Sequence, residues 1–126
     1  MGTVSTFKDL RVWHEAMELV SDVYRITLTF PKYELYGLGQ QMRRAAVSIP
    51  SNIAEGKGRN SNRDFSRFLL TARGSLLELH TQILVAQRLQ YVSQEDGGKL
   101  IARADGIGRG LNALLNVVRE QSPIRS

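Results

Sequence analysis

The sequence predicts an all-α protein, an antiparallel up-down-up-down four-helix bundle, as a single domain over residues 1–126 with an ordered core of about residues 7–120. Three observations predict this fold. Apolar residues recur at alternating spacings of three and four in four consecutive segments, the period of an amphipathic helix. The links between the segments are short, so consecutive helices must run antiparallel. No segment shows the apolar-polar alternation of a strand.

The first helix is expected from Leu10 to Phe30. Thr6 or Asp9 can cap its start, and Pro31 ends it because proline cannot continue the hydrogen-bond ladder. Two adjacent apolar rows indicate that this helix is buried over a wide face. The rows are Leu10, Trp13, Met17, Val20, Tyr24 and Thr27, and Val12, Ala16, Leu19, Val23, Ile26 and Phe30.

The second helix is expected from Leu35 to about Lys57, with Pro50 in its interior. A proline at this position removes the donor for the Ala46 carbonyl and costs ~3 kcal/mol. We therefore expect either a kinked helix or two shorter helices broken at Ile49.

The third helix follows a glycine-bearing turn over residues 56–60, with Ser61 or Asn62 as its cap, and is expected to run to Tyr91. Ser93 is the expected cap of the fourth helix, which has acidic residues in its first turn. Each glycine in a helix costs up to ~1 kcal/mol relative to alanine, so glycines here indicate either close helix approach or a looser element. The fourth helix contains Gly97, Gly98, Gly106, Gly108 and Gly110.

The composition excludes several classes of function. There is no cysteine, which removes disulfides, thiolate catalysis and sulfur-ligated zinc, and fits a reducing compartment. No apolar run approaches the ~18 residues of a membrane span, and the N-terminus lacks the pattern of a secretory signal. We expect a cytoplasmic protein that does not associate with membranes.

The sequence offers no set of residues for catalysis or for a cofactor. A di-iron bundle needs Glu-x-x-His pairs, which are absent, and His14 and His80 are isolated. The glycine-containing segments complete neither a dinucleotide-binding nor a Walker pattern, and no G-x-S-x-G motif supports a hydrolase. We therefore expect no enzymatic activity, no metal and no cofactor.

The whole formal net charge of +5 lies in residues 38–74, the predicted hairpin of the second and third helices. Seven bases face only Glu55 and Asp64 there, whereas the rest of the chain balances ten bases with ten acids. Such a surface predicts contacts with the phosphates of RNA or DNA, and its alternative is a solvated surface with internal ion pairs. The predicted nucleic-acid-binding residues are Arg43, Arg44, Lys57, Arg59, Arg63, Arg67 and Arg73.

Polar residues near the seam of this hairpin predict a structural polar network made of Asn52, Glu55 and Glu78. Buried polar groups need partners, and such a network would fix the register of the two helices. If the turn centres near Asn60, antiparallel neighbours should have residue numbers that sum to about 120.

A second apolar stripe on the third helix predicts a subunit contact. Leu70, Leu77, Leu84 and Tyr91 recur at every seventh residue, beside the row that fills the bundle core. One core cannot cover both rows, so we expect this stripe to be an oligomer interface.

Four motifs resemble a known family. They are FKDLRVW at residues 7–13, YGL at 36–38, QMRRAAVSIPSNIAEG at 41–56 and ARGSLLEL at 72–79. The chain resembles, over about residues 7–118, the bacterial four-helix-bundle proteins named for 23S rRNA intervening sequences, which are relatives of the accessory protein of diversity-generating retroelements. The resemblance implies a cytosolic homopentamer that binds structured nucleic acid or a reverse transcriptase.

The sequence thus favours a non-enzymatic, homo-oligomeric bundle that binds structured nucleic acid through its basic hairpin. The alternative is an oligomeric scaffold or accessory subunit whose basic surface receives an acidic protein. The residues leave open whether the chain belongs to an rRNA insertion, a retroelement or neither.

Overall fold

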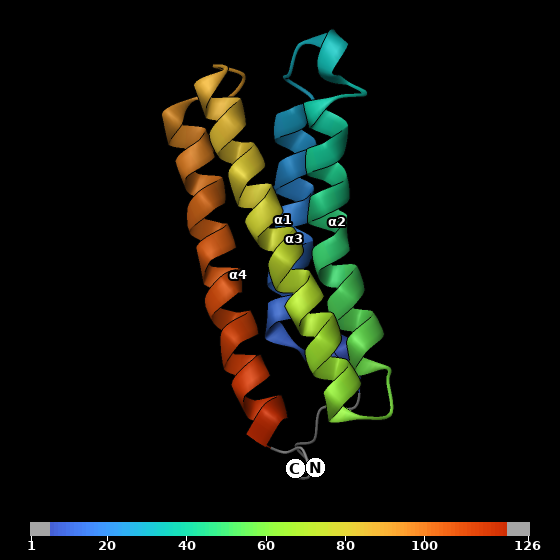
Figure 1. The fold of residues 1–126 in the computed structure, drawn as a ribbon. Coiled ribbons are helices and arrows are strands. Elements are labelled where there is room, and N and C mark those ends of the chain that lie inside the picture. The colour runs from blue at the N-terminus through green and yellow to red at the C-terminus, as the bar shows by residue number, and fades with distance from the viewer. Residues whose placement is uncertain (1–5, 121–126) are drawn as a thin grey trace.

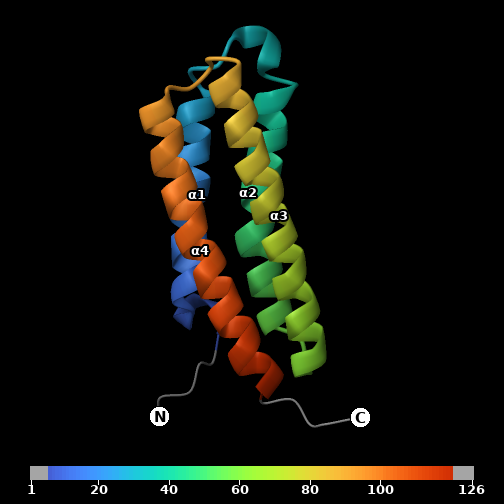
Figure 2. The ribbon, with the colours of Figure 1, turned by 60° about the vertical axis from the view of Figure 1, so that its left-hand side comes forward.

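The computed structural model describes residues 6–120, and over that range the chain forms four α-helices, two short 3-10 helices and no strand (Figure 1). The predicted antiparallel four-helix bundle is confirmed. α1 packs beside α2 and α4, and α3 packs beside the same two helices on the other side of the core (Figure 2). The elements are η1 (Phe7–Asp9), α1 (Arg11–Thr27), η2 (Lys32–Glu34), α2 (Leu38–Lys57), α3 (Asn62–Arg88) and α4 (Gln94–Glu120).

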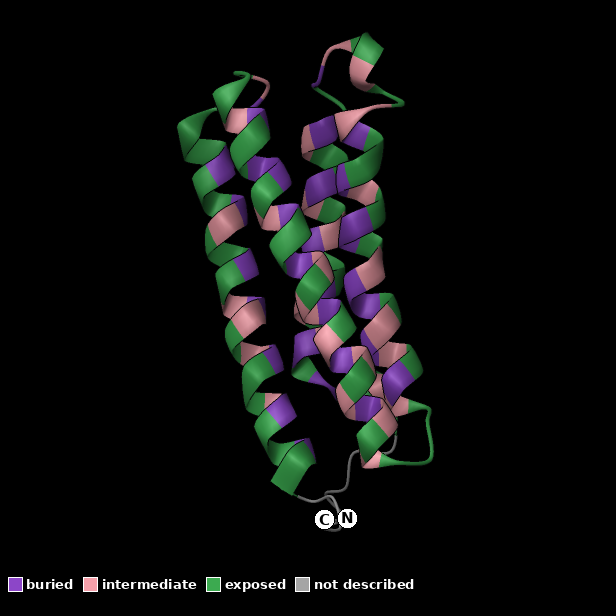
Figure 3. Ribbon diagram, in the orientation of Figure 1, coloured by how far each residue is buried: buried purple, intermediate pink, exposed green. Residues whose placement is uncertain are grey.

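The core is one continuous apolar cluster to which all four helices contribute (Figure 3). Its members recur at the three- and four-residue spacings seen in the sequence, so each helix turns one stripe inward. The largest fully buried side chains are Leu19, Val23, Met42, Ile49, Ile53, Leu69, Leu79, Ile83, Ile107, Leu111 and Leu115.

α1 is shorter than expected at both ends. Thr6 caps the 3-10 helix η1, together with Asp9 in a capping box, rather than α1 itself. At the other end α1 stops at Thr27 instead of Phe30, because the backbone tightens into i→i−3 hydrogen bonds, with the Phe30 amide donating to the Thr27 carbonyl. Phe30 then turns inward and is buried.

α2 begins at Leu38 rather than Leu35, because residues 32–34 form η2 directly after Pro31. The Glu34 carboxylate accepts a hydrogen bond of 2.9 Å from the Leu38 amide and so satisfies one of the open donors at the helix start. α2 continues through Pro50, so the alternative of two helices broken at Ile49 is wrong.

α3 ends at Arg88, three residues before the expected end at Tyr91. Gln90 has a φ of 65°, a left-handed conformation that closes the helix. The Tyr91 hydroxyl lies 3.4 Å from the Tyr33 hydroxyl and donates to the Glu34 carboxylate at 2.9 Å. These hydrogen bonds raise the pKa of Tyr91, and they tie the α3–α4 turn to the α1–α2 link.

The expected caps of the last two helices are confirmed. The Ser61 hydroxyl accepts from the Asp64 amide, and the Ser93 hydroxyl accepts from the Asp96 amide. α4 is one continuous helix despite its glycines.

Close helix approach explains two of the α4 glycines. A Cβ on Gly97 would collide with the side chain of Gln87, and one on Gly110 would lie 3.1 Å from Val12 Cγ2. Gly98 faces open space, and nothing in the structure explains it.

In the described range no helix is both long enough and apolar enough to cross a membrane.

Candidate nucleic-acid interface

The structure places the seven predicted basic residues in four different surroundings. Arg43 faces α1, where its Nε donates to the Thr27 hydroxyl at 2.8 Å and its guanidinium lies 4.8 Å from the centroid of the Tyr24 ring. Arg44 lines the groove between α2 and α3, and Arg73 faces α4. The remaining four residues lie together at the α2–α3 turn.

The turn group, defined as Lys57, Arg59, Arg63 and Arg67, occupies one end of the bundle, beside the start of α1 and the end of α4 (Figure 1). Two features bring the chain around this turn tightly. Gly58 closes α2, and Ser61 caps α3. Lys57 is the last residue of α2, Arg59 lies in the short connecting turn, and Arg63 and Arg67 lie in the first two turns of α3.

Local contacts orient two members of the turn group, Arg59 and Arg67. The Arg59 guanidinium donates to the Glu55 carboxylate at 2.8 Å and lies 4.9 Å from the centroid of the Phe68 ring. Arg67 pairs with Asp64 at 3.3 Å, and Arg63 has no ion-pair partner among the described residues. Because all of these groups are at or near the surface, the ion pairs contribute little to stability.

The charge balance of the turn remains positive after internal pairing. Glu55 and Asp64 each neutralise one arginine, which leaves two positive charges of the turn group without a carboxylate partner. Paired arginines also keep N–H donors that point away from the carboxylate. The turn group therefore has N–H donors for phosphate oxygens that its own ion pairs do not use.

Asn52, Glu55 and Glu78 lie in three separate sets of contacts and do not bond to one another. The Asn52 amide donates to the Ser48 carbonyl and hydroxyl at 2.8 and 2.9 Å, and the Ser48 hydroxyl lies 2.8 Å from that of Ser75. This chain of three polar residues links α2 to α3. Glu55 is exposed beside Arg59, because it lies on the outer side of α2.

Glu78 is also exposed, and its carboxylate accepts from the Gln82 amide at 3.3 Å. Gln82 is a buried polar residue of α3 that the apolar pattern of the sequence does not reveal. The expected register of α2 against α3 is nevertheless observed. Ser48 and Ser75 contact each other, and their residue numbers sum close to the expected value of about 120.

The predicted oligomer stripe divides into two half-buried and two exposed positions. Leu70 is half-buried against the core, and Tyr91 lies beyond the end of α3, with its ring 5.4 Å from that of Phe30. Leu77 and Leu84 are 62% and 49% exposed on the outer side of α3. Only these last two are free to contact another molecule as the bundle stands.

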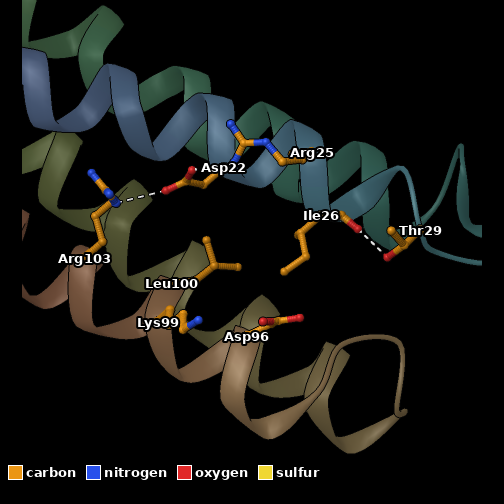
Figure 4. Close-up of a pocket in the computed structure, with 8 residues that line it drawn as sticks. All are labelled: Asp22, Arg25, Ile26, Thr29, Asp96, Lys99, Leu100 and Arg103. Atoms are coloured by element: carbon orange, nitrogen blue, oxygen red, sulfur yellow. Dashed lines mark hydrogen bonds and ion pairs between the residues drawn. The ribbon is translucent and has the colours of Figure 1, made fainter.

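A cleft of about 480 Å³ lies between α1 and α4, and Figure 4 shows its lining. Ile26 and Leu100 form an apolar floor, and charged side chains surround it. Asp22 accepts from Arg25 at 2.8 Å and pairs with Arg103 at 2.9 Å. The Asp22–Arg103 ion pair thus links α1 to α4 across the cleft.

Residues 6–120 contain no group of three or more histidine, cysteine, aspartate or glutamate side chains that could hold a metal ion.

The fold and the turn group define a small four-helix bundle with one basic end. The chain belongs to the 23S rRNA-intervening sequence protein family, whose model matches residues 8–113. It is also similar to the crystal structure of a protein with unknown function from the S23 ribosomal protein family of Bacteroides thetaiotaomicron VPI-5482. The two are 19% identical, with a TM-score of 0.77 over 83% of this chain and 95% of that one, which shows a shared fold. No curated protein matches the chain significantly.

Proposed function

We propose that this protein is a non-enzymatic, cytoplasmic bundle that binds structured nucleic acid through the phosphates of its backbone, using the turn group. The observation that carries the proposal is the set of four cations at one tight turn, with only two carboxylates to neutralise them. Backbone phosphates are a dense array of negative charge, and a cationic surface of this kind binds them by releasing counterions.

The side chains of the turn favour phosphate contacts over base recognition. Arginine presents a planar fork of donors that matches phosphate oxygens, and three of the four cations are arginines. The aromatic rings nearest to them, Phe65 and Phe68, lie beneath Lys57 and Arg59 and are not free to stack on bases. The family's name refers to an intervening sequence of 23S rRNA, which makes structured RNA the first ligand to test.

Oligomerisation would strengthen such binding. We propose that copies of the chain associate through the exposed outer side of α3, where Leu77 and Leu84 lie. The number five comes from the family resemblance alone. Each added copy brings another turn group, so weak contacts combine into avidity.

The test is the salt dependence of RNA binding in a variant with Arg59, Arg63 and Arg67 changed to glutamine. Each phosphate contact contributes about −0.7 to −0.9 to the slope of log affinity against log salt. The variant should bind more weakly at low salt, and its slope should be flatter by roughly 2 to 3 units if all three arginines contact phosphates. Filter binding at several salt concentrations measures both quantities.

A matched control changes Arg25, Lys32 and Arg88 to glutamine, which removes the same charge from the opposite end of the bundle. This control should keep most of the wild-type slope. Equal loss in both variants would show that net charge alone governs binding. Absence of binding by the wild type at low salt would refute the proposal and favour the scaffold alternative, in which the turn group contacts an acidic protein.

A further inference from the structure

We propose that the groove between α3 and α4 is a phosphate-binding site, distinct from the turn group. Its lining includes two arginines, a histidine and an asparagine, against one aspartate. These residues are Arg73, Arg109, His80, Asn112 and Asp105. The shared ligand chemistry is a phosphate group, either in a nucleic-acid backbone or as a free phosphate.

The groove is assembled by the register of the two helices. The Arg73 guanidinium donates to the Asn112 side-chain carbonyl at 2.9 Å, and His80 Nδ1 lies 3.9 Å from the Asp105 carboxylate. Both pairs join α3 to α4, and they lie seven residues apart on each helix. The two pairs are therefore separated by about 10.5 Å along the helices, on the same face.

The contacts within the groove leave donors for an anion. Asn112 accepts one N–H of Arg73 and fixes the direction of the guanidinium, while the other N–H groups of that arginine remain available. Arg109 is exposed and has no ion-pair partner among the described residues. A planar guanidinium held at one edge is suited to a bidentate contact with phosphate oxygens.

One glycine, Gly108, lines the groove, and a Cβ there would lie in ordinary van der Waals contact with Leu76 Cδ2 at 3.4 Å. The cavity volume is about 320 Å³, near the lower limit of the roughly 300–1,000 Å³ of small-ligand sites. This space suits one phosphate with part of its ester group. Leu77 lies at the rim, so the groove opens beside the proposed subunit contact on α3.

The single carboxylate in the groove does not reverse its charge. Asp105 faces His80, and its side chain is 53% exposed to solvent. Two permanently charged arginines outweigh it even when the imidazole is neutral. The net charge of the groove is therefore positive.

The experiment follows the imidazole signals of His80 by NMR in the full chain, with selectively ¹³C-labelled histidine at fixed pH. The probes are inorganic phosphate and a short single-stranded RNA, with sodium chloride at matched ionic strength as the blank. His80 signals should shift with a phosphate-bearing probe beyond the blank. Those of His14, which lies on α1 and bonds to the Lys8 carbonyl, should not.

The double variant Arg73→Gln with Arg109→Gln should weaken the probe's effect on His80 by roughly tenfold or more, because it removes two charge-assisted contacts. The matched control is Arg88→Gln with Arg119→Gln, which removes equal charge from the same two helices outside the groove. Circular dichroism and oligomer mass should be unchanged in both variants.

The two probes distinguish a nucleic-acid phosphate from a free phosphate. A response to both probes supports a nucleic-acid backbone in the groove, and a response to inorganic phosphate alone supports a free phosphate. If the variant with Arg59, Arg63 and Arg67 changed to glutamine loses RNA binding while inorganic phosphate still shifts the His80 signals, the groove binds phosphate independently of the turn group. If His80 responds to neither probe beyond the blank, or responds equally in both double variants, the proposal is overturned.

Discussion

Replacing Gly56 by alanine is expected to lower the free energy of unfolding by about 1–3 kcal/mol, the usual cost of overpacking. A Cβ at this position would lie 2.6 Å from the Cβ of Phe68 and 3.0 Å from Cδ1 of Phe65. The Cβ of Phe68 cannot swing away, because it is attached directly to the α3 backbone. α2 and α3 would therefore have to move apart at this contact, which lies near the α2–α3 turn. Chemical denaturation at one fixed protein concentration measures the change.

Gly98→Ala is the matched control, since Gly98 also lies within a helix but faces open space. Alanine there should stabilise the protein by up to about 1 kcal/mol through its higher helix propensity. Opposite signs for the two substitutions would confirm that close approach, and not propensity, requires glycine at position 56. A Gly56→Ala variant as stable as the wild type would contradict the observed packing of α2 on α3.

The sequence was sufficient for the helices because each depends on local signals. Alternating spacings of three and four placed the buried stripes, and Ser61 and Ser93 marked two helix starts correctly. The end of α2 at Lys57 was also placed correctly, whereas the start of α2 and the end of α3 were misplaced because tertiary contacts decide them. Glu34 caps α2 from the preceding link, and Tyr91 leaves the helical path to reach Glu34, a residue 57 positions away.

In the candidate site, too, the local sequence predicts some features and tertiary packing decides the others. Charge counting identified the basic hairpin, but it could not tell which way each side chain points. Arg43 contacts Thr27 across the α1–α2 seam, and Arg73 contacts Asn112 on α4. Both partners are distant in sequence, so their contacts depend on how the helices pack.

One signal for the α3–α4 groove was available in the sequence. Antiparallel pairing across the short link near Val92 places Arg73 opposite Asn112 and His80 opposite Asp105, with equal sums of residue numbers. Arg109 and Asn112 lie outside the basic hairpin of residues 38–74, so the local excess of charge does not reveal them.

The two proposed phosphate sites lie on a continuous helical frame. α3 carries Arg63 and Arg67 at the turn, followed by Arg73 and His80 in the groove. Because α3 is a single helix of 27 residues, the spacing between these groups is fixed by the helix itself.

Replacing Leu77 and Leu84 together by glutamate is expected to convert the proposed oligomer into a monomer of 14.1 kDa while helicity is retained. Both side chains are about half exposed or more, so charges there are solvated in the monomer and cost the fold little. In an apolar contact between copies the same charges would be buried without partners, which costs several kcal/mol. Light scattering at micromolar concentration measures the mass, and circular dichroism measures the helicity.

The control for this variant is Met17→Glu with Val117→Glu, a pair of similarly exposed apolar residues on α1 and α4. The control should keep the wild-type mass. If only the control variant dissociates, the interface lies on α1 and α4 and not on α3. A wild type that already has the monomer mass would refute oligomerisation. If helicity collapses in the Leu77 and Leu84 variant, these residues support the bundle itself, contrary to their exposure in the structure.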